Sequence, residues 1–219
     1  MIGMRVPSGL ASLRTRAVVA QALLALFLLA SLLVMLAALY MAWRELRSGY
    51  TLYLFTPPIF ALFIALTLLP AAIGLSLWVW RGHANLAADH LTGLKYGALK
   101  AALAPWIPLA NLALPKAAMR ELWNRSHGEE EWFGQQSVDA INSWWTSYVI
   151  GIVILTLLTA MVLIDRFSNL AFLTPPGTNL LALAFSSGLL AASAWFLIRI
   201  ISRITTAQET VTTVGDTFA

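Results

Sequence analysis

The histidines are the residues of this chain whose types and spacing come nearest to a haem or metal site. His83 and His90 are seven residues apart, so on a helix they lie on one face. The axial ligands of a haem iron come from opposite sides of the haem, so His83 and His90 on one helix face do not both bind one haem. The alternative is that one of these histidines binds a haem together with a ligand from another chain. Asp89 beside His90, and the lone His127, do not supply three convergent metal ligands. We therefore expect surface or capping roles for the histidines, with no metal and no cofactor.

Ser126, His127 and Glu129 have the residue types of a hydrolase triad. A working triad needs its base held against the nucleophile and oriented by a third group, and three residues of one short turn do not hold that geometry. The chain has no cysteine, which excludes disulfides, iron–sulfur clusters and cysteine–zinc sites. It also has no phosphate-binding glycine loop. We expect no catalytic residue and no enzymatic activity.

The composition places these residues in a membrane protein. Hydrophobic residues make up 59% of the chain and charged residues 11%, against about 25% charged in a typical soluble domain. Four stretches have the length and apolar character of a segment that crosses a bilayer. None contains Asp, Glu, Lys, Arg or His, which argues against a pump or an ion-coupled carrier. The predicted spans are residues 17–43, 57–80, 144–164 and 180–198.

The sequence therefore predicts an all-α, integral membrane four-helix bundle in a single membrane domain over residues 1–219. The first span follows a basic arm, as the core of a signal peptide does. Its 27 uncharged residues exceed the roughly 7–15 of a signal-peptide core. We expect this segment to be retained as a span rather than cleaved.

Residues 81–142 form the one long hydrophilic section, and prolines interrupt its centre. Pro105, Pro108 and Pro115 lack an amide donor and push the preceding residue away from helical geometry. Residues 105–114 are therefore not expected to form one straight helix. Trp106 and Asn111 lie inside this broken stretch.

After Pro115 the pattern becomes regular, and it predicts an amphipathic helix over Pro115–Arg125. Lys116 and Arg120 are four residues apart, and Glu121 precedes Arg125 by four, which is the favourable order for an ion pair. Such a helix with a basic face can lie in the membrane surface. The alternative is an ordinary loop helix packed on the bundle.

The basic residues predict the orientation. With four spans, 11 of the 14 Lys and Arg residues lie on the side that holds both termini and the middle section. The positive-inside rule places that side in the cytoplasm. A fifth span at residues 96–114 would divide the basic residues seven to seven. We therefore expect this segment to dip partway into the membrane or to lie at its interface.

The tryptophans are distributed as in an aromatic belt. Five lie near the predicted cytoplasmic span ends: Trp78, Trp80, Trp144, Trp145 and Trp195. Trp43 lies at the opposite face. The middle section contains Trp106, Trp123 and Trp132, which would anchor it at headgroup depth.

Small and polar side chains indicate how the spans pack. Ala184, Gly188 and Ala192 are four residues apart on the fourth span, and such a row lets two helices approach closely. The row can face another span or a second subunit. Asn85 and Asn111 lie at boundaries between apolar and polar sequence, and buried amides need partners. We expect the two asparagines to tie the proline-broken segment to the span ends.

From Leu77 to Gln208 the order of features resembles domain-of-unknown-function family 4328, a family of bacterial integral membrane proteins. A tryptophan and a basic residue close a span, an asparagine follows, and further motifs occur in a fixed order. The matching residues are Trp78, Trp80, Arg81, Asn85, Trp106-Ile107-Pro108, Asn111, Pro115, Met119-Arg120-Glu121-Leu122-Trp123, Trp144-Trp145, Arg199, Arg203 and Gln208. Lys116 departs from the pattern, which has an aromatic residue there. The resemblance implies a bacterial inner-membrane protein and no particular activity.

Three functions fit these features. The first is a non-enzymatic scaffold or accessory subunit of a membrane assembly, bound to other membrane subunits or to itself. The second is a binder or carrier of a lipid or small amphipathic molecule, and the third is a haem or quinone protein. In each case the basic residues face a bilayer with anionic headgroups rather than nucleic acid.

Overall fold

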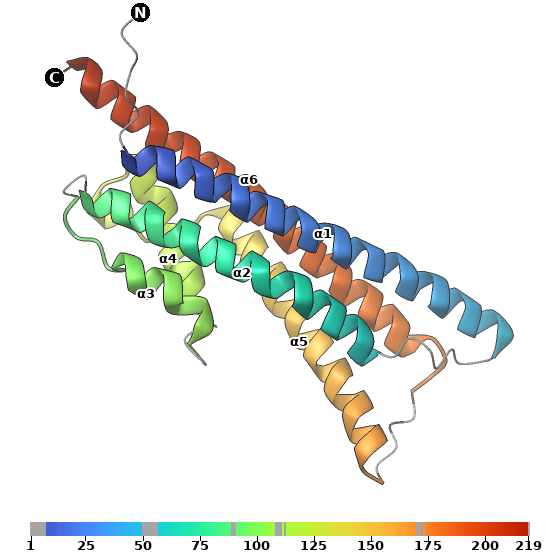
Figure 1. Ribbon diagram of the computed structural model, residues 1–219. Coiled ribbons are helices and arrows are strands. Elements are labelled where there is room, and N and C mark those ends of the chain that lie inside the picture. The colour runs from blue at the N-terminus through green and yellow to red at the C-terminus, as the bar shows by residue number, and fades with distance from the viewer. Residues whose placement is uncertain are drawn as a thin grey trace, which may run out of the picture. The chain divides into compact units, whose positions relative to one another are not determined.

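The computed structural model describes residues 8–49, 57–88, 91–107, 111, 113–169, 172 and 174–218. In this described part the chain is helical (Figure 1). The helices in chain order are α1 (Ser8–Ser48), α2 (Pro57–Ala88), α3 (Ala98–Leu103), the 3-10 helix η1 (Ala104–Trp106), α4 (Leu114–Ser126), the 3-10 helix η3 (Glu131–Phe133), α5 (Asp139–Phe167) and α6 (Thr178–Phe218).

The predicted all-α class is confirmed, together with four helices that are long and apolar enough to cross a membrane: α1, α2, α5 and α6. Each is longer than the apolar stretch that it contains, and α6 continues through Arg199 and Arg203 to Phe218. Charged residues end a membrane span but are good helix formers, so hydropathy and helix ends differ. Pro70 lies inside α2 without ending it.

The chain divides into two compact units, neither of which is continuous in sequence. Unit 1 comprises Met1–Leu23, Pro70–Ser143 and Phe196–Ala219, and unit 2 comprises Leu24–Leu69 and Trp144–Trp195. Unit 1 contains the middle section with α3 and α4. Unit 2 contains most of the apolar sequence.

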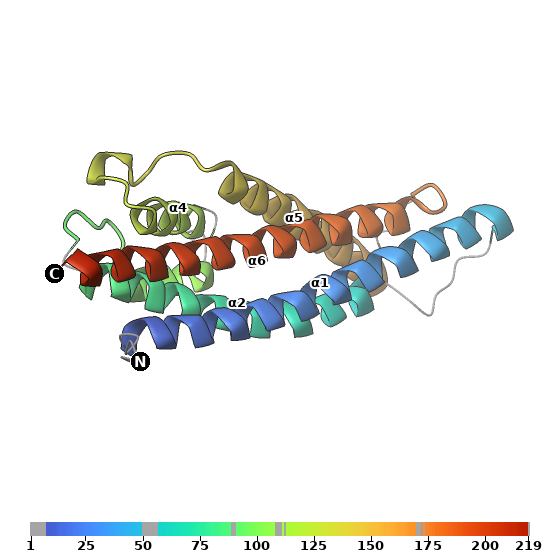
Figure 2. The ribbon, with the colours of Figure 1, turned by 90° about the horizontal axis from the view of Figure 1, so that it is seen from above.

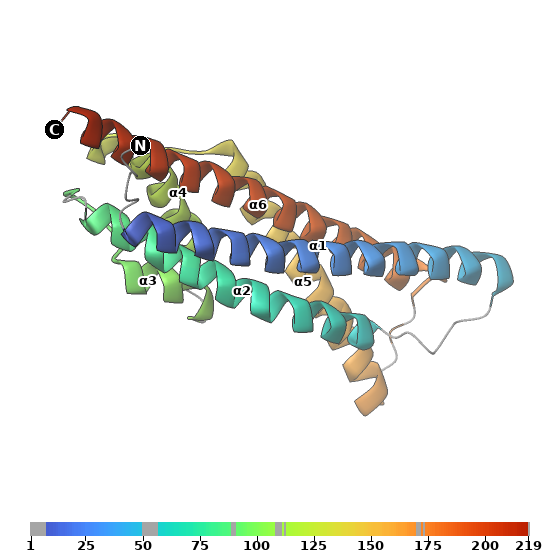
Figure 3. The ribbon, with the colours of Figure 1, turned by 45° about the horizontal axis from the view of Figure 1, so that its top comes forward.

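In unit 2, α5 and α6 approach closely at Gly151. The Ser186 hydroxyl of α6 donates to the Gly151 carbonyl of α5 over 2.7 Å. A Cβ at Gly151 would lie only 3.0 Å from Leu190 Cγ. A small residue at this point is what allows two backbones to come together in lipid. Toward its carboxyl end, α5 diverges from α6, as Figures 1 and 3 both show.

The small-residue row of α6 also packs inside unit 2. Ala184 is buried and Ala192 half-buried. A Cβ at Gly188 would lie 3.2 Å from Met35 Sδ of α1. Of the two alternatives for this row, the structure therefore shows the contact with another span at Gly188.

In unit 1 the helix predicted over Pro115–Arg125 is present as α4, with Pro115 in its first turn. The segment before it is broken as expected, because α3 gives way to η1 at Ala104 and Pro105. Pro108 lies outside the described residues. Figures 1 and 3 show α3 beside the carboxyl-terminal part of α2, and Figure 2 shows α4 beside the carboxyl-terminal part of α6.

Candidate functional site: a buried polar junction in unit 1

Gln208 lies at the centre of a buried hydrogen-bond network that joins three helices. Its Oε1 accepts a hydrogen bond from Asn85 Nδ2 of α2 at 3.2 Å. Its Nε2 donates to Ser126 Oγ at the end of α4 at 2.8 Å and to the Gly82 carbonyl at 3.3 Å. Asn85, Ser126 and Gln208 are all buried. One primary amide therefore links α2, α4 and α6.

A second link joins α2 to α6, one turn before Gln208 along α6. The indole Nε1 of Trp78 donates to Thr205 Oγ1 at 3.2 Å, and Trp78 is fully buried. Thr205 precedes Gln208 by three residues, so both side chains lie on the same face of α6. On α2, Trp78 and Asn85 are seven residues apart, or about two turns, so their side chains also lie on one face of that helix.

His83 lies between these two links, and it is fully buried. Its ring lies close to the backbone of Ala118 in α4, but neither ring nitrogen has a hydrogen-bond partner in the described part of the chain. The surface role expected for this histidine is therefore wrong. A polar side chain at the end of a span can point toward neighbouring helices or toward the surface, and the sequence does not show which direction His83 takes. His90 lies outside the described residues.

Glu121 of α4 holds the chain segment that precedes α3. Its two carboxylate oxygens accept hydrogen bonds from the backbone amides of Lys95 and Tyr96. Burial raises the pKa of the Glu121 carboxyl, while the two amide bonds and the nearby charges of Arg125 and Lys95 act in the opposite direction. The charge of Arg125 thus acts on Glu121, as the spacing predicts, while the Arg125 guanidinium also donates to the carbonyls of Thr92 and Glu129.

Asn124 fixes the segment that follows α4. Its Nδ2 lies 3.0 to 3.2 Å from the carbonyl oxygens of Phe133, Gly134 and Gln136. Sequence reasoning assigned this residue no role of its own. It shares the four-residue spacing of Lys116 and Arg120, which reads as an exposed face, whereas Asn124 is buried. The loop after α4 has backbone carbonyls that need hydrogen-bond donors, but nothing in the sequence shows that Asn124 is the donor.

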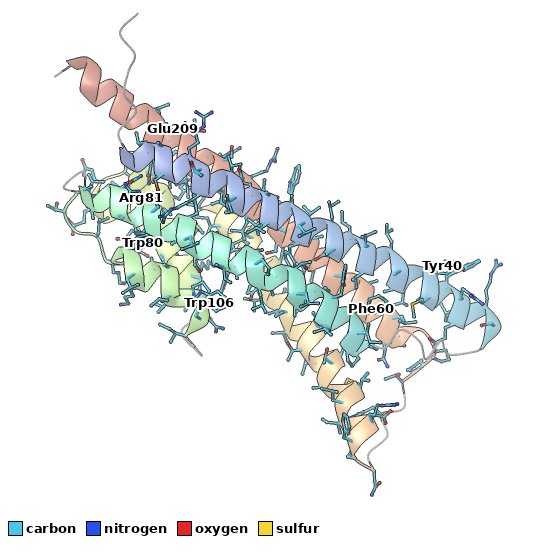
Figure 4. All side chains as sticks on the ribbon, in the orientation of Figure 1. Tyr40, Phe60, Trp80, Arg81, Trp106 and Glu209 are labelled. Carbon is cyan, nitrogen blue, oxygen red and sulfur yellow. The ribbon has the colours of Figure 1, made fainter. Side chains whose placement is uncertain are left out.

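Two arginines tie α1 to α2 within unit 1. Arg16 Nη1 donates to the Leu77 carbonyl at 3.1 Å, and its guanidinium lies 4.8 Å from the ring centroid of Trp80. In the other direction, Arg81 Nε donates to the Gly9 carbonyl at 3.2 Å. Figure 4 labels Trp80 and Arg81 at this end of α2.

The structure gives Asn85 a different role from the predicted one, whereas the role predicted for the Asn111 side chain stays a prediction. Asn85 does not tie the proline-broken segment; it joins α2 to α6. Asn111 is half-buried, and its backbone amide donates to Ile107. Trp106 makes the connection instead, since its Nε1 donates to Ser76 Oγ of α2 at 2.9 Å.

The aromatic-belt expectation is wrong for three tryptophans. Trp78, Trp144 and Trp145 are buried, with the rings of the last two in edge contact. Hydropathy gives the level of a residue along a span but not the direction in which its side chain points. Among the described side chains, the exposed tryptophans are Trp43, Trp80, Trp106 and Trp195, for which the belt position stays a prediction.

The remaining predicted residues of α4 lie around the junction. Pro115 is buried, and Arg120 is half-buried with an Nε that has no partner among the described residues. Trp123 stacks on His127 with ring centroids 4.7 Å apart. Because more than half of α4 is buried, this helix packs on unit 1, as the loop-helix alternative proposed.

The junction connects α2, α4 and α6 through hydrogen bonds between buried side chains. Within the described residues, no three His, Asp or Glu side chains come together as metal ligands. Apart from the ring nitrogens of His83, the polar groups of the junction bond one another and the backbone. Removing any of them would leave a buried partner unsatisfied.

Residues 56–206 match the family described as domain of unknown function (DUF4328). The chain belongs to this family. The match includes α2 to α5 and most of α6, and with them every junction residue except Gln208, which lies two residues beyond it. Neither the curated proteins nor the solved structures compared with this DUF4328 chain gave a match.

Proposed function

We propose that this DUF4328 chain is a non-enzymatic scaffold or accessory subunit of a membrane protein assembly. The observation that supports the proposal is the exposure of α5. In its most apolar window only 17% of the residues are buried within the chain, against 50% for α6. Ile150, Val153 and Leu157 are exposed at helical spacing, so they form an apolar stripe. A span of another membrane subunit, or of a second copy, would cover it.

The membrane is the bacterial inner membrane, and both termini lie in the cytoplasm. Charge supports this orientation, because 11 of the 14 basic residues lie on the side of the termini and the middle section. A reporter protein that is active only in the cytoplasm should be active when fused at Met1 or at Ala219, and one that is active only in the periplasm should be inactive. A periplasmic signal from either fusion would contradict the orientation.

Crosslinking from within the membrane tests the scaffold proposal. A photoreactive amino acid at Leu157 of α5 should give one discrete protein adduct in native membranes. The same amino acid at Leu33 of α1, which is equally exposed, is the matched control and should give lipid adducts. Lipid adducts from both positions, with a monomeric mass after mild solubilisation, would overturn the proposal.

A groove in unit 2 favours a second function, the binding of a lipid or a small amphipathic molecule. It has a volume of about 340 Å³ and lies between α2 and α5. Ala61 and Ala65 form one wall, and Thr156 and Thr159 contribute to the other. Both threonine hydroxyls donate to carbonyls of their own helix, so the wall is suited to an acyl chain.

Filling the groove tests this second function. The Ala65→Phe variant should lose a lipid that native mass spectrometry detects on the wild-type protein. Leu66→Phe is the matched control, because Leu66 is exposed and is not part of the groove lining; it should retain the lipid. Equal lipid retention by both variants would contradict binding in the groove.

A further inference from the structure

A stripe of large apolar side chains runs along the outer face of α3 and η1. Leu99 is 66% exposed and Trp106 43% exposed, with Leu103 and Ile107 exposed between and beyond them. Successive spacings of four and three residues place Leu99, Leu103 and Trp106 on one helical face, and Ile107 follows in extended backbone. The other face consists of small residues buried against the rest of unit 1: Ala101, Ala102 and Ala104. The segment is therefore anchored by alanines and presents its large side chains outward.

Trp106 fixes the level of this stripe along α2. Its hydrogen bond to Ser76 holds η1 against α2. Helix α2 is long and apolar enough to cross a membrane. Ser76 precedes Arg81 by five residues, or ~7 Å along the helix axis. The α2 side chains exposed near this level are Ile73 and Leu77. The stripe thus lies at the same level as the apolar surface of a candidate span.

The other end of the segment is basic. Lys95 and Lys100 are exposed, and their ammonium groups lie 5.9 and 5.6 Å from the ring centroid of Tyr96. The segment therefore passes from Lys95 and Lys100, with Leu99 beside them, to Leu103 and the indole of Trp106 at the other end. This order matches the passage from anionic headgroups to acyl chains across a membrane interface.

We propose that α3 and η1 are an interfacial segment inserted into the leaflet that surrounds the carboxyl-terminal part of α2. Leu99, Leu103 and Trp106 lie among the upper acyl chains, and Lys95 and Lys100 bind anionic headgroups. The bilayer is favoured over a protein partner because the stripe lies level with the exposed face of α2 and ends in cations. The inference rests on the membrane location of the chain and not on its role as a scaffold.

The absence of cysteine from the chain allows a direct test. Leu103→Cys and Leu99→Cys, each labelled with bimane, are compared with Gly97→Cys, whose position is exposed and has open space around it. The protein is placed in nanodiscs of phosphatidylcholine and phosphatidylglycerol. A label at Leu103 should be quenched by shallow doxyl lipids and protected from aqueous iodide, whereas the label at Gly97 should be quenched by iodide.

Each other outcome overturns the inference in a recognisable way. Iodide quenching at Leu103 equal to that at Gly97 would place the stripe in water. Protection from both quenchers would mean that protein covers it. Leu66→Cys in α2, at an exposed position inside a candidate span, serves as the control for membrane insertion. Lipid quenching at this control, without lipid quenching at Leu103, would refute the interfacial segment but leave the scaffold proposal untouched.

The headgroup part of the proposal has its own measurement. Doxyl-phosphatidylglycerol should quench the Leu103 label more strongly than doxyl-phosphatidylcholine at the same low mole fraction. In the background of Lys95→Gln and Lys100→Gln, this preference should be lost. It should be retained in the matched background Arg44→Gln and Arg47→Gln, in which the two charges removed lie near the carboxyl end of α1. A preference that survives the loss of both lysines would refute their role.

Discussion

Replacing Gln208 by leucine should destabilise the protein more than any other single polar change in α6. Leucine is similar in size, so the change removes hydrogen bonds without opening a large cavity. It leaves the Asn85 amide and the Ser126 hydroxyl without the partner that they have in the junction. Both residues are buried, at 7% and 3% exposure, so water does not replace Gln208 easily.

The size of the effect follows from these two groups. A buried polar group left without a partner costs ~1–3 kcal/mol, so the two together cost ~2–6 kcal/mol. For a chain of this length, 1 kcal/mol corresponds to a change of ~2–4 °C in the melting temperature. The Gln208→Leu variant should therefore melt at least ~4 °C below the wild-type protein.

Thermal unfolding in nanodiscs, followed by circular dichroism, measures this shift. Thr206→Leu is the matched control, because Thr206 is exposed on the same helix, and its melting temperature should stay close to that of the wild type. The Asn85→Leu and Gln208→Leu double variant provides a second check. Because the two residues share a hydrogen bond, their effects should fail to add by ~0.5–3 kcal/mol. Strict additivity, or a Gln208→Leu variant as stable as the control, would refute the network.

Three further predictions concern other contacts. Asn124→Leu leaves loop carbonyls unsatisfied, so trypsin should cleave after α4 faster than in the wild type; equal rates would contradict the clamp. Because burial raises the pKa of Glu121, its folded form holds a proton more tightly than the unfolded chain, and its contribution to stability should be lost as the pH rises through the folded pKa. Glu121→Gln should remove this slope from a plot of melting temperature against pH, and an unchanged slope would exclude the carboxyl as its source. Gly151→Ala should lower the melting temperature more than Gly188→Ala, because its new methyl group meets the backbone oxygen of Ser186 at 3.1 Å, whereas at Gly188 it meets a flexible methionine; the reverse order would contradict the close approach.

Some of the junction was visible in the sequence, and some was not. Asn85 and Gln208 were recognised as elements of the family pattern, but nothing in their order showed that they pair across 123 residues. The i to i+4 rule pairs Glu121 with Arg125, whose charge does act on it, but it does not predict the bonds of Glu121 to the backbone. That rule applies to an exposed helix surface, whereas the side of α4 that carries Glu121 is covered by the backbone of Lys95 and Tyr96.

The amino-acid sequence is enough to predict the all-α class, the four apolar stretches, the helix after Pro115 and the break before it. These features depend on local chain properties: runs of apolar residues of a given length, and prolines that lack an amide hydrogen. The tertiary structure decided which polar and aromatic side chains point inward. Trp78, His83 and Asn124 are buried although hydropathy places them at span ends or on a charged helix. Burial depends on the neighbouring helix, and that neighbour is set by contacts between residues far apart in the chain.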